Sequence, residues 1–254
     1  MYSPLLQRLG RRYHVTALAM RCMWPNVGGP PKQRDWQVYV DDLIAFLEKQ
    51  NQGPVIGMGH SMGAACSVLA AQQRPDLFSA LVLIETVMVT RTANRVMRLL
   101  PRQLMLRTQP AKGTLAKTDA WDSRQRFVDS YSRHRAYKRF DAEAWMAVEQ
   151  HGVTEAGNGT FRLAFPKQWE AHNYTLPLYL IDNLAALSIP CVSIQTKPSL
   201  FCAAPLWAEW RQRCPETVFL EAPEFGHLLP LESAQTTDGL IQRGLESIGF
   251  SIKR

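Results

Sequence analysis

Short apolar runs alternate with amphipathic segments over much of this chain. Runs such as Ala80 to Glu85, "ALVLIE", are almost continuously apolar, which is typical of strands that are buried on both faces of a sheet. The stretch "HVTALAM" is short and partly β-branched, which also favours a strand. The strands that this pattern predicts are 14–20, 54–58, 80–85, 190–196 and 217–222.

The segments between these runs have helical periodicity. Ser3 and Pro4 are typical of a helix start, and Gly10 ends that helix. Asp35 precedes apolar positions that repeat about every 3.6 residues up to Gly53. The predicted helices are 3–10, 35–53, 62–73 and 233–248. Strands that alternate with helices indicate an α/β fold, with a mostly parallel sheet covered by helices on both faces.

The alternation stops between Thr90 and Leu187. This segment has helical composition and is rich in arginine and aromatic residues, so we expect a helical insertion. The sequence therefore predicts a core in two parts, residues 1–89 and 188–254, with a helical cap over 90–187.

Charge is concentrated in the same segment. The chain of 254 residues has a net charge of +7, and 13 Lys and Arg stand against three Asp between Arg91 and Phe140, a local excess of +10. One interpretation is an apolar pocket whose charged mouth attracts acidic substrates or an anionic surface. The other is an amphipathic helical pair with solvated arginines and aromatics against the core. A lid suffices to explain the charge, so we expect no nucleic-acid partner.

Targeting and cofactor signals are missing from the sequence. No stretch approaches the roughly 20 apolar residues of a membrane span, and the first residues have no apolar signal core, so we expect a cytoplasmic location and no stable membrane insertion. Five cysteines without a CxxC pair indicate reduced, packed thiols and no metal site. We expect no cofactor, and the oligomeric state stays open.

The sequence Gly59-His60-Ser61-Met62-Gly63 is the main candidate for chemistry. A G-x-S-x-G motif between a strand and a helix forms a sharp turn that exposes the serine and places helix N–H groups behind it. Serine needs a neighbouring base because its hydroxyl is protonated at neutral pH. Ser61 is therefore the predicted nucleophile, and a structural turn is the alternative.

His227 is the candidate base. It lies in "EFGHLLPLE", shortly after the last predicted strand, and can reach the carboxyl edge of the sheet. The other five histidines are less suitable: His60 is expected to point away from Ser61, and the rest precede a strand or fall in the insertion, namely His14, His134, His151 and His172.

These features resemble the α/β-hydrolase family. The resemblance rests on the elbow around Ser61, the "ALVLIE" run, the cap that follows it and "GHLLPLE" near the end, and it covers the chain from Tyr2 to about Gly249. It implies a serine hydrolase. Haloalkane dehalogenases and epoxide hydrolases are excluded, because they have an aspartate where this chain has Ser61.

The family also implies an acid that orients the base. The usual aspartate would lie in "CVSIQTKPSLFCAAPLW", which has no acid. Some relatives have the acid at the end of the strand after the elbow helix, and Glu85 fits that place. A charged residue at the end of an apolar strand also needs a partner, which His227 would supply. Asp182, Glu221 and Glu224 are weaker candidates.

The resemblance predicts the oxyanion site only in part. The Met62 N–H would be one donor. The loop with the second donor and about three leading strands are expected to be absent, because the sequence starts at what resembles the helix after that loop. Either Met1 is a misplaced start or the product is impaired, since losing one donor lowers turnover by about 10² to 10³.

The expected activity is cofactor-free hydrolysis of a carboxylic ester or related acyl compound through an acyl-enzyme, with a small apolar acyl substrate. A non-catalytic relative that binds an apolar ligand or a partner protein is the alternative. A third possibility retains the same residues for acyl transfer or for hydrolysis of a C–C bond.

Overall fold

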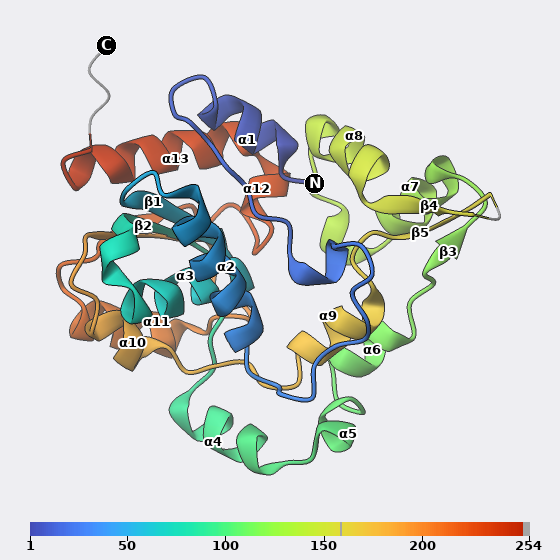
Figure 1. Cartoon of the computed structure of the whole chain (residues 1–254), viewed down its shortest axis with the longest axis horizontal. Coiled ribbons are helices and arrows are strands. Elements are labelled where there is room, and N and C mark those ends of the chain that lie inside the picture. The colour runs from blue at the N-terminus through green and yellow to red at the C-terminus, as the bar shows by residue number, and fades with distance from the viewer. Residues whose placement is uncertain (158, 251–254) are drawn as a thin grey trace. The chain divides into compact units, whose positions relative to one another are not determined.

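The computed structural model describes residues 1–157 and 159–250 (Figure 1). Contacts within the chain divide it into two compact units. Unit 1 comprises Met1–Arg34, Pro101–Thr175 and Leu228–Asp238. Unit 2 comprises Asp35–Leu100, Leu176–His227 and the stretch that begins at Gly239. Each unit is therefore assembled from segments that lie far apart in the sequence.

Unit 2 is built on a four-stranded parallel sheet with the order β1-β2-β6-β7. Its strands are β1 (Val55–His60), β2 (Phe78–Ile84), β6 (Cys191–Gln195) and β7 (Val218–Glu221). All residues of β6 are buried, as are six of the seven in β2, which explains their apolar sequences. The α/β fold with a mostly parallel sheet is confirmed, and four of the five predicted strands are present.

Helices pack against this sheet. The helix α3 (Met62–Gln73) follows β1 directly, and its small residues Ala64, Ala65 and Ala70 are buried. A Cβ atom at Gly244 would lie 2.4 Å from Val192 of β6, so the last helix approaches the sheet closely. The helices that contribute to unit 2 are α2 (Gln37–Gln50), α3, the 3₁₀ helix η2 (Pro75–Leu77), α4 (Arg91–Leu99), α10 (Ile181–Ala185), α11 (Ala204–Arg213) and the part of α13 (Ala234–Ser247) from Gly239.

Unit 1 combines short helices with a small antiparallel sheet of order β3-β5-β4. The strands are β3 (Ala120–Trp121), β4 (Val153–Ala156) and β5 (Thr160–Leu163). The helices are α1 (Ser3–Leu9), α5 (Arg102–Met105), α6 (Ala111–Leu115), α7 (Arg124–Ser132), α8 (Ala142–His151), α9 (Lys167–Asn173), α12 (Leu229–Glu232) and the 3₁₀ helices η1 (Arg21–Met23) and η3 (Arg135–Tyr137). The sequence pattern predicted the helices of this region but not its sheet.

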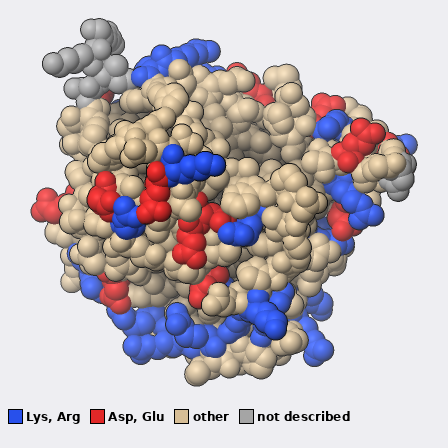
Figure 2. Space-filling model, in the orientation of Figure 1, with Lys and Arg blue, Asp and Glu red and all other residues tan. Residues whose placement is uncertain are grey.

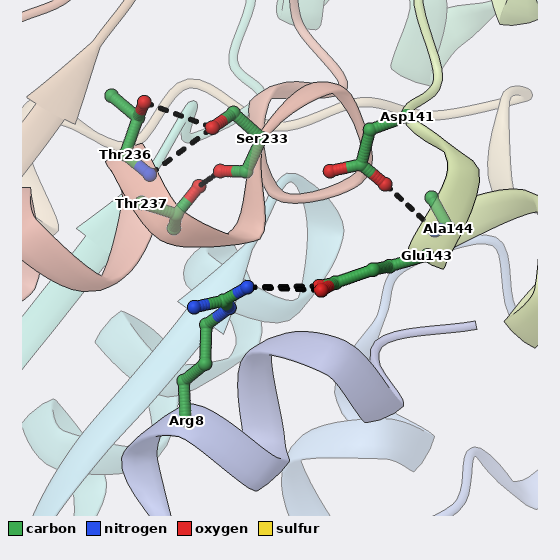
Figure 3. A network of polar contacts seen from close by, with 7 residues as sticks. All are labelled: Arg8, Asp141, Glu143, Ala144, Ser233, Thr236 and Thr237. Atoms are coloured by element: carbon green, nitrogen blue, oxygen red, sulfur yellow. Dashed lines mark hydrogen bonds and ion pairs between the residues drawn. The ribbon is translucent and has the colours of Figure 1, made fainter.

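Polar contacts connect the three segments of unit 1, and Figure 3 shows the one between Arg8 and Glu143 together with the bonds around Asp141 and Ser233. Arg8 of α1 forms an ion pair of 3.0 Å with Glu143 of α8, and the Asp141 carboxylate accepts a hydrogen bond from the Ala144 N–H. The Asp141 N–H donates to the Leu231 carbonyl at 3.2 Å. Beside it, the Ser233 side chain accepts the N–H of Thr236 and thereby caps the start of α13.

The aromatic residues of the predicted insertion form a core within unit 1. Trp121 and Phe127 are buried, with ring centroids 5.0 Å apart, and Val148 and Val153 complete the cluster. Tyr131 packs against the same cluster. These side chains therefore contact one another and stabilise the unit, as the amphipathic interpretation predicts.

The predicted strand at 14–20 is wrong. These residues have no strand assignment in the structure, and none of them is buried. A β-branched run forms a strand only when a neighbouring strand completes its ladder of hydrogen bonds. The described residues supply no such neighbour to this segment.

The two units divide the chain differently from the predicted segments. Residues 1–34 and 228–238 group with 101–175, while 90–100 and 176–187 group with the parallel sheet. The prediction that 90–187 covers the site stays a prediction. Within the described residues, no helix is both long enough and apolar enough to cross a membrane.

Basic side chains of the charged segment lie on α4. Figure 2 shows Lys and Arg gathered along the lower edge of the view, in the region where Figure 1 labels α4. Arg91, Arg95 and Arg98 are exposed, and Arg91 forms an ion pair of 2.7 Å with Asp182. Part of the local positive charge is therefore balanced within unit 2.

Candidate active site

The turn between β1 and α3 carries Ser61, which is partly buried. Its backbone is in an uncommon conformation, with φ 55° and ψ −120°, and α3 starts at the next residue. The Ser61 N–H donates to the Ile84 carbonyl at 2.9 Å, and its own carbonyl accepts the N–H of Ala64. A Cβ atom at Gly59 would lie 2.4 Å from the backbone of Gly63 and Ala64. The absence of a side chain at Gly59 therefore allows the start of α3 to lie directly against the end of β1.

His227 lies within hydrogen-bond distance of this serine. The Nε2 atom of His227 is 2.9 Å from the Ser61 Oγ. His227 is carried by the loop after β7, which is fixed by bonds from the Ala222 N–H to the Gln195 carbonyl and from the Phe225 N–H to the Ala222 carbonyl. The structure thus brings together the nucleophile and the base that the sequence predicts.

Glu85 completes a chain of contacts to His227. It follows β2 with φ 48° and is 2% exposed. One carboxylate oxygen, Oε2, lies 3.2 Å from His227 Nδ1, and the other, Oε1, accepts the Thr196 N–H at 2.6 Å. Both oxygens of this buried group therefore have a partner, as a buried carboxylate requires.

These contacts select one tautomer of the histidine. A carboxylate can only accept, so the proton of a neutral His227 is assigned to Nδ1, where it donates to Glu85. Nε2 then has a free lone pair directed at the Ser61 hydroxyl. Ser61 is the donor in that bond, which is the arrangement that proton transfer to a base requires.

The other candidate acids have different surroundings. Asp182 forms ion pairs with Arg91 at 2.7 Å and Arg213 at 2.8 Å. Glu221 is paired with Arg211 at 2.5 Å on the surface, and Glu224 is exposed. Of the four acids considered, Glu85 is the one for which the structure records a bond to His227.

The remaining histidines divide between the two units. His14, His134, His151 and His172 belong to unit 1. His60 belongs to unit 2, and its Nε2 donates to the carbonyl oxygen of His227 at 2.7 Å. Its contact with the candidate base was not predicted. The sequence signal for it is its place beside the nucleophile.

Phe201 is a second neighbour of His227 that the sequence did not reveal. Its ring stacks on the imidazole with centroids 4.3 Å apart and planes 23° apart. Phe201 lies in the loop after β6, where its carbonyl accepts the Met88 N–H and its own N–H donates to the Ser199 hydroxyl. The loop that lacks the usual acid thus contacts the base through an aromatic ring.

Met62 is at the position predicted for an oxyanion donor. It is the first residue of α3, so its N–H has no acceptor within the helix. The N-terminus of a helix also favours negative charge. The backbone next to Ser61 is therefore suited to an anionic oxygen.

The thiols of this chain are buried, and burial and the nearby Glu85 carboxylate both raise the pKa of Cys202. All five cysteines are free and buried, as predicted, and burial raises the pKa of Cys66, Cys191 and Cys202 to about 12. Across residues 1–157 and 159–250, no group of three or more His, Cys, Asp or Glu side chains is arranged to hold a metal ion.

Comparison with known proteins identifies the family. The model of the "Alpha/beta hydrolase family" matches residues 1–238, so the chain belongs to the alpha/beta hydrolase family. The structure of MenH from S. aureus matches with a TM-score of 0.68 over 97% of this chain and 88% of that one. Their sequences are 15% identical, so this likeness concerns the fold.

Curated relatives match over shorter stretches. Monoglyceride lipase of Rattus norvegicus is 41% identical over 59 residues, which is 22% of this chain and 20% of the lipase. Karrikin insensitive 2 receptor IA of Petunia hybrida is 32% identical over 71 residues, 24% of this chain and 26% of the receptor. The matched stretches thus span about a quarter or less of these relatives.

Proposed function

We propose that this protein is a serine hydrolase that cleaves a carboxylic ester or related acyl compound through an acyl-enzyme. The observation that carries the proposal is the continuous chain of contacts from Glu85 through His227 to Ser61, with 3.2 Å and 2.9 Å between the bonded atoms. A buried acid, an oriented imidazole and a serine in a strained turn form the arrangement that activates a hydroxyl.

The first half of the reaction forms the acyl-enzyme. The Ser61 Oγ attacks the carbonyl carbon of the substrate while its proton moves to His227 Nε2. The carbonyl oxygen becomes negative and accepts the Met62 N–H, and Glu85 stabilises the imidazolium. When the tetrahedral intermediate collapses, the bond to the alcohol breaks and His227 gives that alcohol its proton.

The second half releases the acid. A water molecule transfers a proton to His227 Nε2 and attacks the acyl carbon, and the bond to Ser61 Oγ breaks as the serine regains that proton. The net reaction consumes one water molecule and produces an alcohol and a carboxylic acid. Metal ions and cofactors have no part in these steps.

The proposed substrate is a small apolar acyl compound. Support comes from the rat relative, whose name describes a lipase for monoglycerides, although its matched stretch is short. We also propose that residues 90–187 act as a cap over the acyl site, which was expected from their place after the strand that ends near Glu85.

A fluorophosphonate probe tests the nucleophile. We expect covalent labelling of the wild-type protein and loss of labelling in Ser61→Ala. Ser67→Ala is the matched control, because Ser67 is a buried serine of the same helix whose hydroxyl donates to the Gly63 carbonyl. Hydrolysis of p-nitrophenyl esters of increasing acyl length then measures acyl preference. Labelling that persists in Ser61→Ala would contradict the proposal.

A binding protein is the second candidate. It is favoured by the similarity to a petunia protein named as a receptor. Folded wild-type protein that neither reacts with the probe nor hydrolyses any ester of the series would support this candidate in place of the hydrolase.

A further inference from the structure

His60 connects the strand of the nucleophile with the backbone of the base. It is the last residue of β1 and the neighbour of Ser61 in sequence. Its Nε2 atom lies 2.7 Å from the carbonyl oxygen of His227, and the two imidazole rings have centroids 5.1 Å apart. Ser61 and His227 are thus joined twice, once through their side chains and once through His60.

The donor in this contact is defined by its chemistry. A carbonyl oxygen can only accept, so His60 must have its proton on Nε2. The ring is neutral, because burial and the neighbouring His227 lower the pKa of His60 to about 3. His60 therefore donates to the His227 carbonyl throughout the neutral pH range.

The contact fixes a part of the backbone that the proposed reaction depends on. The loop that carries His227 is bonded to β6 at Ala222, five residues before the base. The bond from His60 fixes the loop at His227 itself. A displacement of about 1 Å in a catalytic group can lower a rate about 10²-fold, so this last bond is where fixation matters most.

We propose that His60 is a positioning residue that holds the backbone of His227 at the distance from Ser61 that proton transfer needs. This inference rests on the proposed function, since it concerns the same base and nucleophile. In this role His60 acts through His227.

A neutral donor suits this place better than a cation. His227 becomes positively charged when it takes the proton of Ser61, and a second positive charge about 5 Å away would oppose that change. His227 is the titratable group that shifts the pKa of His60, and the other side of the His227 imidazole bonds Glu85 through Nδ1. A histidine whose pKa is lowered by burial donates a hydrogen bond without adding charge.

Three substitutions of His60 distinguish the loss of its hydrogen bond to His227 from the loss of its packing. His60→Leu retains apolar bulk and removes the donor. His60→Gln places an amide N–H near the position of the imidazole Nε2, while the side chain of His60→Asn is one methylene shorter and does not reach the His227 carbonyl. The measurements are kcat and KM for a short p-nitrophenyl ester, and the melting temperature of each variant.

We expect His60→Leu and His60→Asn to lower kcat about 10- to 100-fold with KM changed less than threefold, and His60→Gln to retain kcat within about threefold of the wild type. The comparison of Gln with Asn holds even if the Leu variant does not fold. Wild-type kcat in His60→Asn, or equal loss in Gln and Asn, would overturn the inference.

The same variants separate this inference from the proposed function. If the wild-type protein is not labelled by the fluorophosphonate, the proposed function fails. If it is labelled in a manner that depends on Ser61, and His60→Asn reacts equally fast, the function stands and the role of His60 is refuted.

Discussion

Ser61 and Glu85 follow adjacent parallel strands, and both have a positive φ, 55° at Ser61 and 48° at Glu85. The residues before them, His60 and Ile84, are partners in the register of β1 and β2. Residues that directly follow neighbouring parallel strands lie close together at the carboxyl edge of the sheet. The loop after β7 places His227 at the same edge. A non-glycine residue with a positive φ costs about 1–3 kcal/mol, and such strain is typical of functional sites.

Glu85→Gln tests the acid of the site. Because Glu85 Oε1 accepts the Thr196 N–H, the amide oxygen of glutamine should occupy that place and its NH₂ group should face His227 Nδ1. Two donors would then oppose each other, and His227 would move its proton to Nε2, where it can no longer accept from Ser61. We expect kcat to fall by about 10³ to 10⁴, measured with a short ester.

The melting temperature serves as the control for this substitution, because glutamine has nearly the same shape as glutamate. A variant that melts within a few degrees of the wild type and still hydrolyses the ester at a comparable rate would remove Glu85 from the proposed triad. Glu221→Gln is the matched substitution of a surface acid and should be neutral.

Phe201→Leu tests the stacking on the base. The leucine retains apolar volume but loses the flat face that lies 4.3 Å from the imidazole, so His227 gains freedom to rotate. We expect a fall in kcat of about tenfold with little change in KM, measured by steady-state kinetics. Leu200→Ala, at a neighbouring side chain that is 77% exposed, is the control. A larger loss in the control than in Phe201→Leu would contradict this role.

Gly59→Ala and Gly63→Ala should affect stability in opposite ways. At Gly59 the added Cβ meets the backbone of α3 at 2.4 Å, so β1 and α3 must separate. At Gly63 the same atom meets nothing within 4 Å, and alanine favours a helix by about 1 kcal/mol. Urea unfolding should show a loss of more than about 2 kcal/mol for Gly59→Ala. An equal free energy of unfolding for the two variants would contradict the close contact between Gly59 and the backbone of α3.

His60 should make stability depend on acidity. Its pKa is lowered from about 6.5 to about 3 in the folded protein, so between these values the unfolded chain binds a proton that the folded one does not. The free energy of unfolding therefore decreases as the pH falls through this window, by up to about 1.4 kcal/mol per pH unit from this group. Urea titrations at several pH values should show a shallower decrease for His60→Gln, which cannot take up a proton. Parallel curves would contradict the assignment.

Much of unit 2 could be predicted from the sequence, because its strands are buried on both faces and its turns use distinctive residues. The apolar runs at 80–85 and 190–196 correspond to β2 and β6, and the G-x-S-x-G motif locates the turn after β1. The contact of Glu85 with His227 could be anticipated because some members of the family that the chain resembles have the acid at the end of this strand, and because a carboxylate at the end of an apolar strand requires a partner.

The remaining features depend on tertiary contacts that no local pattern records. The strand predicted at 14–20 has suitable residues but no partner strand, and the strands of unit 1 have partners but are only two to four residues long, too short for their alternation to stand out. His60 and Phe201 meet His227 only after segments more than 20 residues apart in the sequence come together. Nothing in the sequence distinguished Phe201, and the place of His60 beside Ser61 did not reveal which group its ring would contact.

The bond from Thr196 to Glu85 has a consequence for sequence variation. The donor is a main-chain N–H, which every amino acid except proline possesses. Position 196 can therefore change its side chain, within the space available at a buried site, and still hold the carboxylate in place. Substitutions other than proline at this position retain the N–H that orients the acid, whereas proline removes it. The orientation of Glu85 therefore depends on the backbone conformation at position 196 and not on which side chain stands there.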